Sequence, residues 1–262
     1  MSQPLAERIR PNSLEEYLSQ QHLVGDKGAI AAQLSSGMIS SMIFWGPPGT
    51  GKTTLANILA KESQRPFYTL SAIDSGVAAV REVIQKAKQN DTLFSSKSPI
   101  LFIDEIHRLS PAVEENLYPA MEDFKFDLIL GQGPQARTIE MPLPRFTLAG
   151  ATTKTGLLTG PMRDRFGFIG RVQYYGHQAL QEVVTRSAAL LGVPCELDGA
   201  AEIASRSRGT PRIANRLLRR VRDFAEVEGT GAIEVDLARY ALERLGVDEN
   251  GFDSLDRKFL DA

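Results

Sequence analysis

The sequence predicts an α/β protein in which a parallel-sheet domain is followed by a smaller all-helical domain. Three observations lead to this prediction. Short apolar runs alternate with helix-like stretches in the first half of the chain, strand signals fade after about residue 175, and a glycine-rich loop joins the first apolar run to the first helical stretch. Strands separated by helices of this length imply right-handed crossovers, which build parallel sheets covered on both faces.

The first half of the chain contains the strands and helices of the predicted sheet domain. Leu55 and Ile58 mark the apolar face of the first helical stretch, and Val80 and Val83 mark that of the second. The expected strands are 41–45, 66–70, 99–103 and 146–150, and the expected helices are 53–62 and 77–88.

Residues 124–144 depart from this alternation. Two β-prone segments, 126–130 and 137–141, flank Gly131-Gln132-Gly133-Pro134, so we expect a β-hairpin insertion at about 125–144. The hairpin tip has no alternation that would bury it. It is either a contact device or an ordinary long surface hairpin.

Helical spacing dominates the rest of the chain, with glycines as breaks. The expected helices are 177–191, 198–207, 211–226 and 235–245. We therefore expect a nucleotide-binding α/β domain over 1–174, on the grounds given below, and a helical lid domain over 175–262.

Composition excludes several classes of protein. The 262 residues include 30 Lys and Arg against 32 Asp and Glu, a formal net charge of -2, so any basic surface must be local. A single cysteine, Cys195, cannot form an internal disulfide. With no long apolar run and no basic-then-apolar start, the expectation is a cytoplasmic protein without membrane contact.

The strongest motif is a glycine-rich loop between a predicted strand and a predicted helix. The glycines let backbone N–H groups converge on a phosphate, and the helix N-terminus adds partial positive charge. Lys52 is expected to reach the β- and γ-phosphates, and the Thr53 hydroxyl to ligate Mg²⁺. The loop reads Gly46-Pro47-Pro48-Gly49-Thr50-Gly51-Lys52-Thr53, followed by Thr54.

Two acids end the strand predicted at 99–103 and complete a site for phosphoryl transfer. Asp104 is expected to hold Mg²⁺ through its water shell, and Glu105 to polarise the attacking water. A positive charge beside the γ-phosphate should also exist. The candidates are the arginines of Met162-Arg163-Asp164-Arg165-Phe166-Gly167 and Arg212, with surface salt bridging as the alternative for each arginine. His107 and Arg108 are either helix-face residues or couple the site to a neighbour.

These residues resemble those of AAA+ ATPases, and the sequence is similar to two families of that class. Residues 4–90 resemble the RarA/MgsA replication-associated recombination ATPases, and residues 101–258 resemble RuvB, the branch-migration motor of Holliday junctions. The mixture suggests an intermediate lineage or a fusion with a junction near 91–100. The residues that carry the RarA likeness include Arg10-Pro11, Gln20-Gln21-His22-Leu23 and Ser71-Ala72-Ile73-Asp74; those for RuvB include Phe102-Ile103-Asp104-Glu105-Ile106-His107-Arg108, Arg163-Asp164-Arg165-Phe166-Gly167 and Arg208-Gly209-Thr210-Pro211-Arg212.

The resemblance implies a role for each matching position. Lys52 and Thr53 look like Walker A, Asp104 and Glu105 like Walker B, and either Thr152 or Thr153 like sensor 1. Arg165 is similar to the arginine finger that enters the neighbouring subunit of a ring, and Arg212 to sensor 2. The nucleotide-contacting positions outside the loop are implied to be Ile9, Arg10, Tyr17 and Tyr175.

The resemblance also implies partners and leaves three hypotheses. The first is an ATP-hydrolysing motor module of a hexameric ring that acts on Holliday junctions and binds a RuvA-like partner through the hairpin. The second is a RarA-like ATPase of the replication fork, related to clamp loaders. The third is a nucleotide-binding module with little turnover, because the C-terminal winged-helix domain of RuvB has no counterpart in these residues. Arginines between 206 and 222 offer at most a weak DNA surface.

Overall fold

The computed structural model confirms the α/β class and the helical domain that follows the sheet. It describes residues 5–72, 80, 82–83, 97–130 and 137–260, and most of the predicted helix 77–88 lies outside them. The chain divides into two compact units. The sheet unit comprises Gln21–Gly46 and Lys52–Val172, and the lid unit comprises Met1–Gln20, Pro47–Gly51 and Gln173–Ala262.

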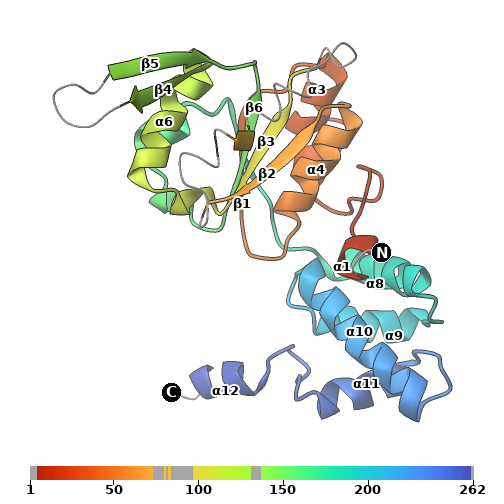
Figure 1. Ribbon diagram of the computed structural model, residues 1–262. Helices are drawn as coiled ribbons and strands as arrows, with labels where there is room; N and C mark the ends of the chain where they lie inside the picture. The colour runs from red at the N-terminus through yellow and green to blue at the C-terminus, as the bar shows by residue number, and fades with distance from the viewer. Residues whose placement is uncertain (1–4, 73–79, 81, 84–96, 131–136, 261–262) are drawn as a thin grey trace. The chain divides into compact units, whose positions relative to one another are not determined.

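Five parallel strands form the centre of the sheet unit within the described residues, in the order β2-β3-β6-β1-β7 (Figure 1). The strands are β1 Met42–Trp45, β2 Phe67–Ser71, β3 Ile100–Asp104, β6 Thr147–Thr152 and β7 Phe168–Arg171. The sequence predicted the first four and missed β7. This edge strand buries a single residue, Gly170, so it lacks the apolar run that marks an interior strand.

Helices cover both faces of the sheet. Figure 1 shows α3 (Ala29–Ser36) and α4 (Lys52–Glu62) on one side and α6 (Pro111–Glu122) on the other. Leu117 of α6 is buried in one apolar cluster with Ile103 of β3 and Leu148 of β6. Phe102 alternates with Ile103 along the strand and faces the opposite way, and it is also fully buried. Burial on both faces fixes the position of each strand end.

A separate two-stranded sheet is formed by β4 (Lys125–Leu130) and β5 (Arg137–Pro142), which pair antiparallel. The Lys125 ammonium lies 3.0 Å from the Glu140 carboxylate, and the Phe126 side chain is buried in the same apolar cluster as Leu117. The base of this hairpin is therefore anchored on α6. Residues 131–136, at the predicted tip, lie outside the described residues.

The lid unit is a helical bundle. Its helices include α8 His177–Leu191, α9 Leu197–Ser205, α10 Pro211–Glu228 and α11 Val235–Arg244, close to the predicted ranges, together with α1 Leu5–Arg8 and α12 Ser254–Leu260, which were not predicted. An apolar core joins the helices through residues such as Val184, Ile203, Leu218 and Leu242. Gly192 ends α8 in the left-handed conformation (φ 72°), which favours glycine.

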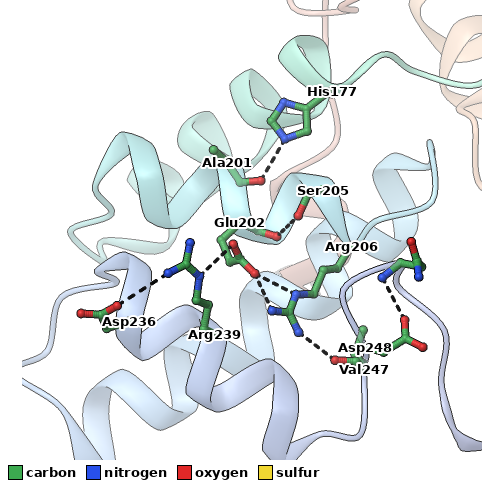
Figure 2. A network of polar contacts seen from close by, with 10 residues as sticks. His177, Ala201, Glu202, Ser205, Arg206, Asp236, Arg239, Val247 and Asp248 are labelled. Atoms are coloured by element: carbon green, nitrogen blue, oxygen red, sulfur yellow. Dashed lines mark hydrogen bonds and ion pairs between the residues drawn. The ribbon is translucent and has the colours of Figure 1, made fainter.

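A polar network ties α9 to the chain that follows α11 (Figure 2). The Glu202 carboxylate accepts hydrogen bonds from the guanidinium groups of Arg206 at 2.8 Å and Arg239 at 3.3 Å. Arg206 also donates to the carbonyl of Val247 at 2.9 Å. Because Arg206 is almost fully buried, loss of the Glu202 carboxylate would leave its charge uncompensated inside the lid unit.

Short helical segments complete the sheet unit: α2 Gln21–Val24, η1 Ile106–Arg108, η3 Thr155–Leu157 and α7 Gly160–Asp164. Among the described residues, every helix is too short or too polar to cross a membrane.

Candidate functional site

The strand order brings three predicted parts of the site to one edge of the sheet. β6 lies between β1 and β3, and parallel strands present their carboxyl ends at the same edge. β1 runs into loop 46–53, β3 ends at Asp104, and β6 ends at Thr152. The Gly46 N–H donates to the Thr152 carbonyl at 3.2 Å. The start of the loop is thus joined directly to the end of β6.

The glycines of the loop adopt conformations that other residues rarely adopt. Gly46, Gly49 and Gly51 have φ values of 149°, 80° and 99°. A Cβ atom on Gly46 would lie 2.0 Å from the Val172 carbonyl oxygen. Such a loop presents bare backbone, so it fits the cradle that a phosphate group requires.

Lys52 and the first turn of α4 supply the charge expected beside that cradle. Lys52 is only 7% exposed, and its ammonium donates to the Gly46 carbonyl at 2.9 Å. The Thr50 hydroxyl donates to the Pro47 carbonyl at 2.8 Å and closes the loop. Thr53 and Thr54 stand in the first turn of α4, where free N–H groups and the helix dipole favour an anion.

The two acids at the end of β3 differ in backbone conformation. Asp104 lies in the strand, and its Oδ1 accepts from the Glu105 N–H at 3.1 Å. Glu105 has φ 50°, in the left-handed region, which is uncommon for a residue with a side chain. Backbone strain of this kind costs about 1–3 kcal/mol and is concentrated at functional sites.

Two side chains contact the Glu105 carboxylate, and a third lies behind one of them. The Thr153 hydroxyl donates to Glu105 Oε2 at 3.3 Å, and His107 Nδ1 lies 3.3 Å from the same oxygen. His107 Nδ1 also lies 2.8 Å from the hydroxyl of Thr152, which is fully buried. The structure therefore places Thr153 on the glutamate and Thr152 behind it.

Asp104 and Thr53 provide the oxygen donors that Mg²⁺ prefers, so this donor set fits the ion. Within the described ranges, no group of three or more His, Cys, Asp or Glu residues forms a metal cluster.

The lid unit holds the residues predicted to wall the base of the nucleotide. Ile9, Tyr17 and Tyr175 are buried, and the side chains of Tyr17 and Tyr175 are close enough to influence each other's pKa. Burial raises the pKa of Tyr17 well above its usual value and that of Tyr175 to about 12, so both stay neutral. Arg10 is exposed; its backbone N–H donates to the Glu7 carbonyl at 3.3 Å, and its carbonyl accepts from the Asn12 side-chain amide at 3.4 Å.

Arg186 and a glutamine pair hold this N-terminal segment in place, and sequence reasoning missed them. The Arg186 guanidinium donates to the carbonyls of Glu16 at 2.7 Å and Ile9 at 3.2 Å. Gln20 donates to the Gln173 carbonyl and accepts from its N–H, both at 2.9 Å. These contacts join residues 153–177 positions apart, and no local pattern in the sequence signals them.

Two residues of the lid unit contact the loop segment 47–51 of the same unit. The Arg212 N–H donates to the Gly49 carbonyl at 3.4 Å, and the Tyr17 hydroxyl donates to the Gly51 carbonyl at 3.3 Å. A Cβ on Gly49 would lie 2.9 Å from the Cβ of Arg212. The predicted sensor 2 residue is therefore packed against the backbone of the phosphate loop, while its side chain is exposed.

Arg165 lies at the end of α7 and faces α6. Its guanidinium pairs with Glu122 at 3.1 Å, stacks over the Tyr118 ring at 4.2 Å, and donates to the Pro161 carbonyl at 2.8 Å. Among the described contacts none joins Arg165 to Lys52 or Glu105. The described contacts of the Arg165 guanidinium are therefore with α6 and with its own helix α7.

Comparison with known proteins gives two family matches that together span most of the chain. Residues 9–172 match the Holliday junction DNA helicase RuvB P-loop domain, and residues 175–248 match the RuvB AAA lid domain.

Solved structures of Thermotoga maritima RuvB are similar over nearly the whole chain. A lysine-to-arginine variant is 38% identical with a TM-score of 0.82, and the match covers 97% of this chain and 78% of that one. The Holliday junction branch migration motor of the same organism is also 38% identical, with a TM-score of 0.79 and the same coverage. The P-loop match includes residues 9–90 and spans 91–100, so the comparisons give no support to the RarA resemblance or to a fusion there.

Proposed function

Because the chain belongs to the RuvB family of Holliday junction motor ATPases, we propose that it binds ATP with Mg²⁺ and hydrolyses it to ADP and phosphate to drive branch migration. One observation carries the chemical part of this proposal. At the edge where the phosphate loop begins, β6 sets the Thr153 hydroxyl against the carboxylate of Glu105, which follows β3. The group proposed to activate water and the loop proposed to bind phosphate then lie at the same edge of the sheet.

Phosphate binding falls to the loop and α4. The backbone of loop 46–51 cradles the phosphates, and Lys52 transfers its hydrogen bond from the Gly46 carbonyl to the terminal phosphates. Thr53 and Asp104 hold magnesium, which when bound neutralises charge on the phosphate oxygens. Ile9, Arg10, Tyr17 and Tyr175 are proposed to wall the base, with Arg212 at the phosphates.

Glu105 is proposed to act as the general base. Both described contacts of its carboxylate are made by Oε2, and Oε1 has no hydrogen bond among the described residues. Oε1 is therefore available to accept a proton from water. The half-buried hydroxyl of Thr153 points to the same group, so we assign sensor 1 to Thr153 rather than to buried Thr152.

Arg165 is proposed to serve the site of a neighbouring subunit. Its guanidinium is occupied by Glu122 and Tyr118 of α6, and no described contact joins it to Glu105, which is compatible with a finger that acts in trans. Head-to-tail contacts of this kind close into a ring when the rotation permits, and the proposed assembly is a hexamer.

The proposed partners are Holliday junction DNA and a RuvA-like protein. The hairpin β4–β5 supports the second, because it forms a sheet separate from the five-stranded one and its base is anchored in the core of the sheet unit. A docking element needs such a fixed base so that binding does not disturb the catalytic edge.

The test of the hydrolytic proposal is the Glu105→Gln variant. Removing the base should lower ATP turnover by about 10²–10⁴-fold while ATP still binds. Phosphate release and calorimetric nucleotide affinity are the measurements, and Glu115→Gln, on the exposed face of α6, is the charge-matched control. Turnover of Glu105→Gln equal to that of the parent chain would mean that the protein is a nucleotide-binding module without this chemistry.

A further inference from the structure

His107 occupies a position that the general phosphoryl-transfer chemistry does not require. It lies in η1, two residues after Glu105, and its side chain is only 6% exposed. One ring nitrogen, Nδ1, lies 2.8 Å from Thr152 Oγ1 and 3.3 Å from Glu105 Oε2. A single histidine atom thus contacts a carboxylate that follows β3 and a hydroxyl at the end of β6.

The chemistry of the partners determines which atom carries the hydrogen. An ionised carboxylate can only accept, so a favourable contact with Glu105 requires a hydrogen on Nδ1. Thr152 Oγ1 already accepts from the Lys154 N–H at 3.0 Å, and a hydroxyl oxygen has a second lone pair for Nδ1–H. The arrangement is consistent throughout when His107 donates from Nδ1 to both oxygens.

Thr152 links this histidine to the phosphate loop. Its hydroxyl contacts His107, and its carbonyl accepts from the Gly46 N–H, the first residue of the loop. Thr152 is also paired in register with Trp45 of β1 and has no exposed surface. The position of the His107 ring is therefore fixed by a buried residue of the sheet.

We propose that His107 is a positioning residue for hydrolysis, which holds the Glu105 carboxylate by Oε2 so that Oε1 faces the attacking water. Glu105 needs such a hold because its backbone is in the strained left-handed region and its side chain is 35% exposed. Thr153 supplies a second hold on the same oxygen. The inference deepens the proposed function and rests on Glu105 as the base.

The test compares three substitutions in the full chain. The amide nitrogen of asparagine lies where Nδ1 lies, that of glutamine lies nearer to the place of Nε2, and leucine has no donor. His107→Asn should keep kcat within about 3-fold of the parent, whereas His107→Gln and His107→Leu should lower kcat by roughly 10–100-fold, as expected for a misplaced reacting group. KM for ATP should stay within about 2-fold in all three.

The outcomes separate this inference from its premise. The proposal is overturned if the asparagine variant loses as much kcat as the other two, if the glutamine and leucine variants keep the parent rate, or if KM rises in step with the loss of kcat. Glu105→Gln is measured beside them. If it keeps full turnover, the premise fails, and if it loses turnover while His107→Leu does not, only the positioning role fails.

Discussion

The sheet unit and the lid unit assemble their functional residues in different ways. In the sheet unit, Asp104 and Thr152 end β3 and β6, and Lys52 begins α4 after the loop that leaves β1, so the strand order brings them to one edge. In the lid unit, Ile9 is held by the side chain of Arg186, 177 positions away in sequence. Hydrolytic groups are thus fixed by buried sheet register, and the nucleotide wall is fixed by long-range polar contacts.

This difference predicts which kinetic or binding quantity changes when each unit is altered. A register of buried strands cannot shift without turning side chains to the wrong face, so groups at its edge keep their geometry. Each hydrogen bond from an arginine to a backbone carbonyl contributes about 1.5–3 kcal/mol to the stability of the contact, and one can be lost without the others. Changes in the sheet unit should therefore alter turnover, and changes in the wall should alter nucleotide affinity.

Arg165 gives the largest expected effect and tests whether the sheet unit completes its own site. Arg165→Ala should lower ATP turnover by about 10³-fold, the low end for an arginine finger. Mixing Arg165→Ala subunits with Glu105→Gln subunits should restore activity, because the first keep an intact acid and the second still offer the arginine. Phosphate release across mixing ratios is the measurement.

The control for this mixing experiment is Arg163→Ala, which removes an exposed arginine from the same short helix α7. It should keep the parent turnover. If mixtures of the two inactive variants show no more activity than the average of the separate variants, Arg165 does not act in trans. The Arg165 side chain would then have to leave α6 and reach the acids of its own chain.

The strand ends explain why much of the catalytic edge could be read from the sequence. The runs before Gly46, Asp104 and Thr152 are buried on both faces, so they read as short continuous apolar stretches with sharp ends. The helices of the lid were equally visible, because their apolar faces point to one core. The fold class could therefore be predicted from the local pattern of apolar residues.

Other features left no local signal. β7 is an edge strand that buries only Gly170, and α12 buries none of its residues, so neither has an apolar run. Arg186 and Gln173 act through backbone carbonyls or N–H groups of distant segments, which any residue can offer. Even His107, noted beside the acids, gained a definite role only when β6 brought Thr152 to it.

Arg186 tests the lid unit's half of the comparison. Arg186→Lys keeps a charge but cannot bridge the carbonyls of Glu16 and Ile9, so the N-terminal wall should loosen. We expect ATP affinity to fall about 10-fold, which corresponds to loss of one such hydrogen bond, with kcat at saturating ATP unchanged. Calorimetry and steady-state kinetics measure both.

Arg216→Lys, at an exposed position of α10, is the matched control for Arg186→Lys and should bind as the parent does. A fall in kcat without a loss of affinity in Arg186→Lys would contradict the division of labour between the two units.

The smallest expected effect isolates one contact between the N-terminal wall and the loop. Tyr17→Phe and Tyr175→Phe each remove one buried phenol hydroxyl, but only the first removes the hydrogen bond from the Tyr17 hydroxyl to the Gly51 carbonyl. Tyr17→Phe should therefore weaken ATP binding about 5-fold more than Tyr175→Phe, close to 1 kcal/mol for one neutral hydrogen bond. Equal affinities of the two variants would show that the wall supports nucleotide binding without that contact, and the Tyr17 ring packed against Gly51 would then suffice.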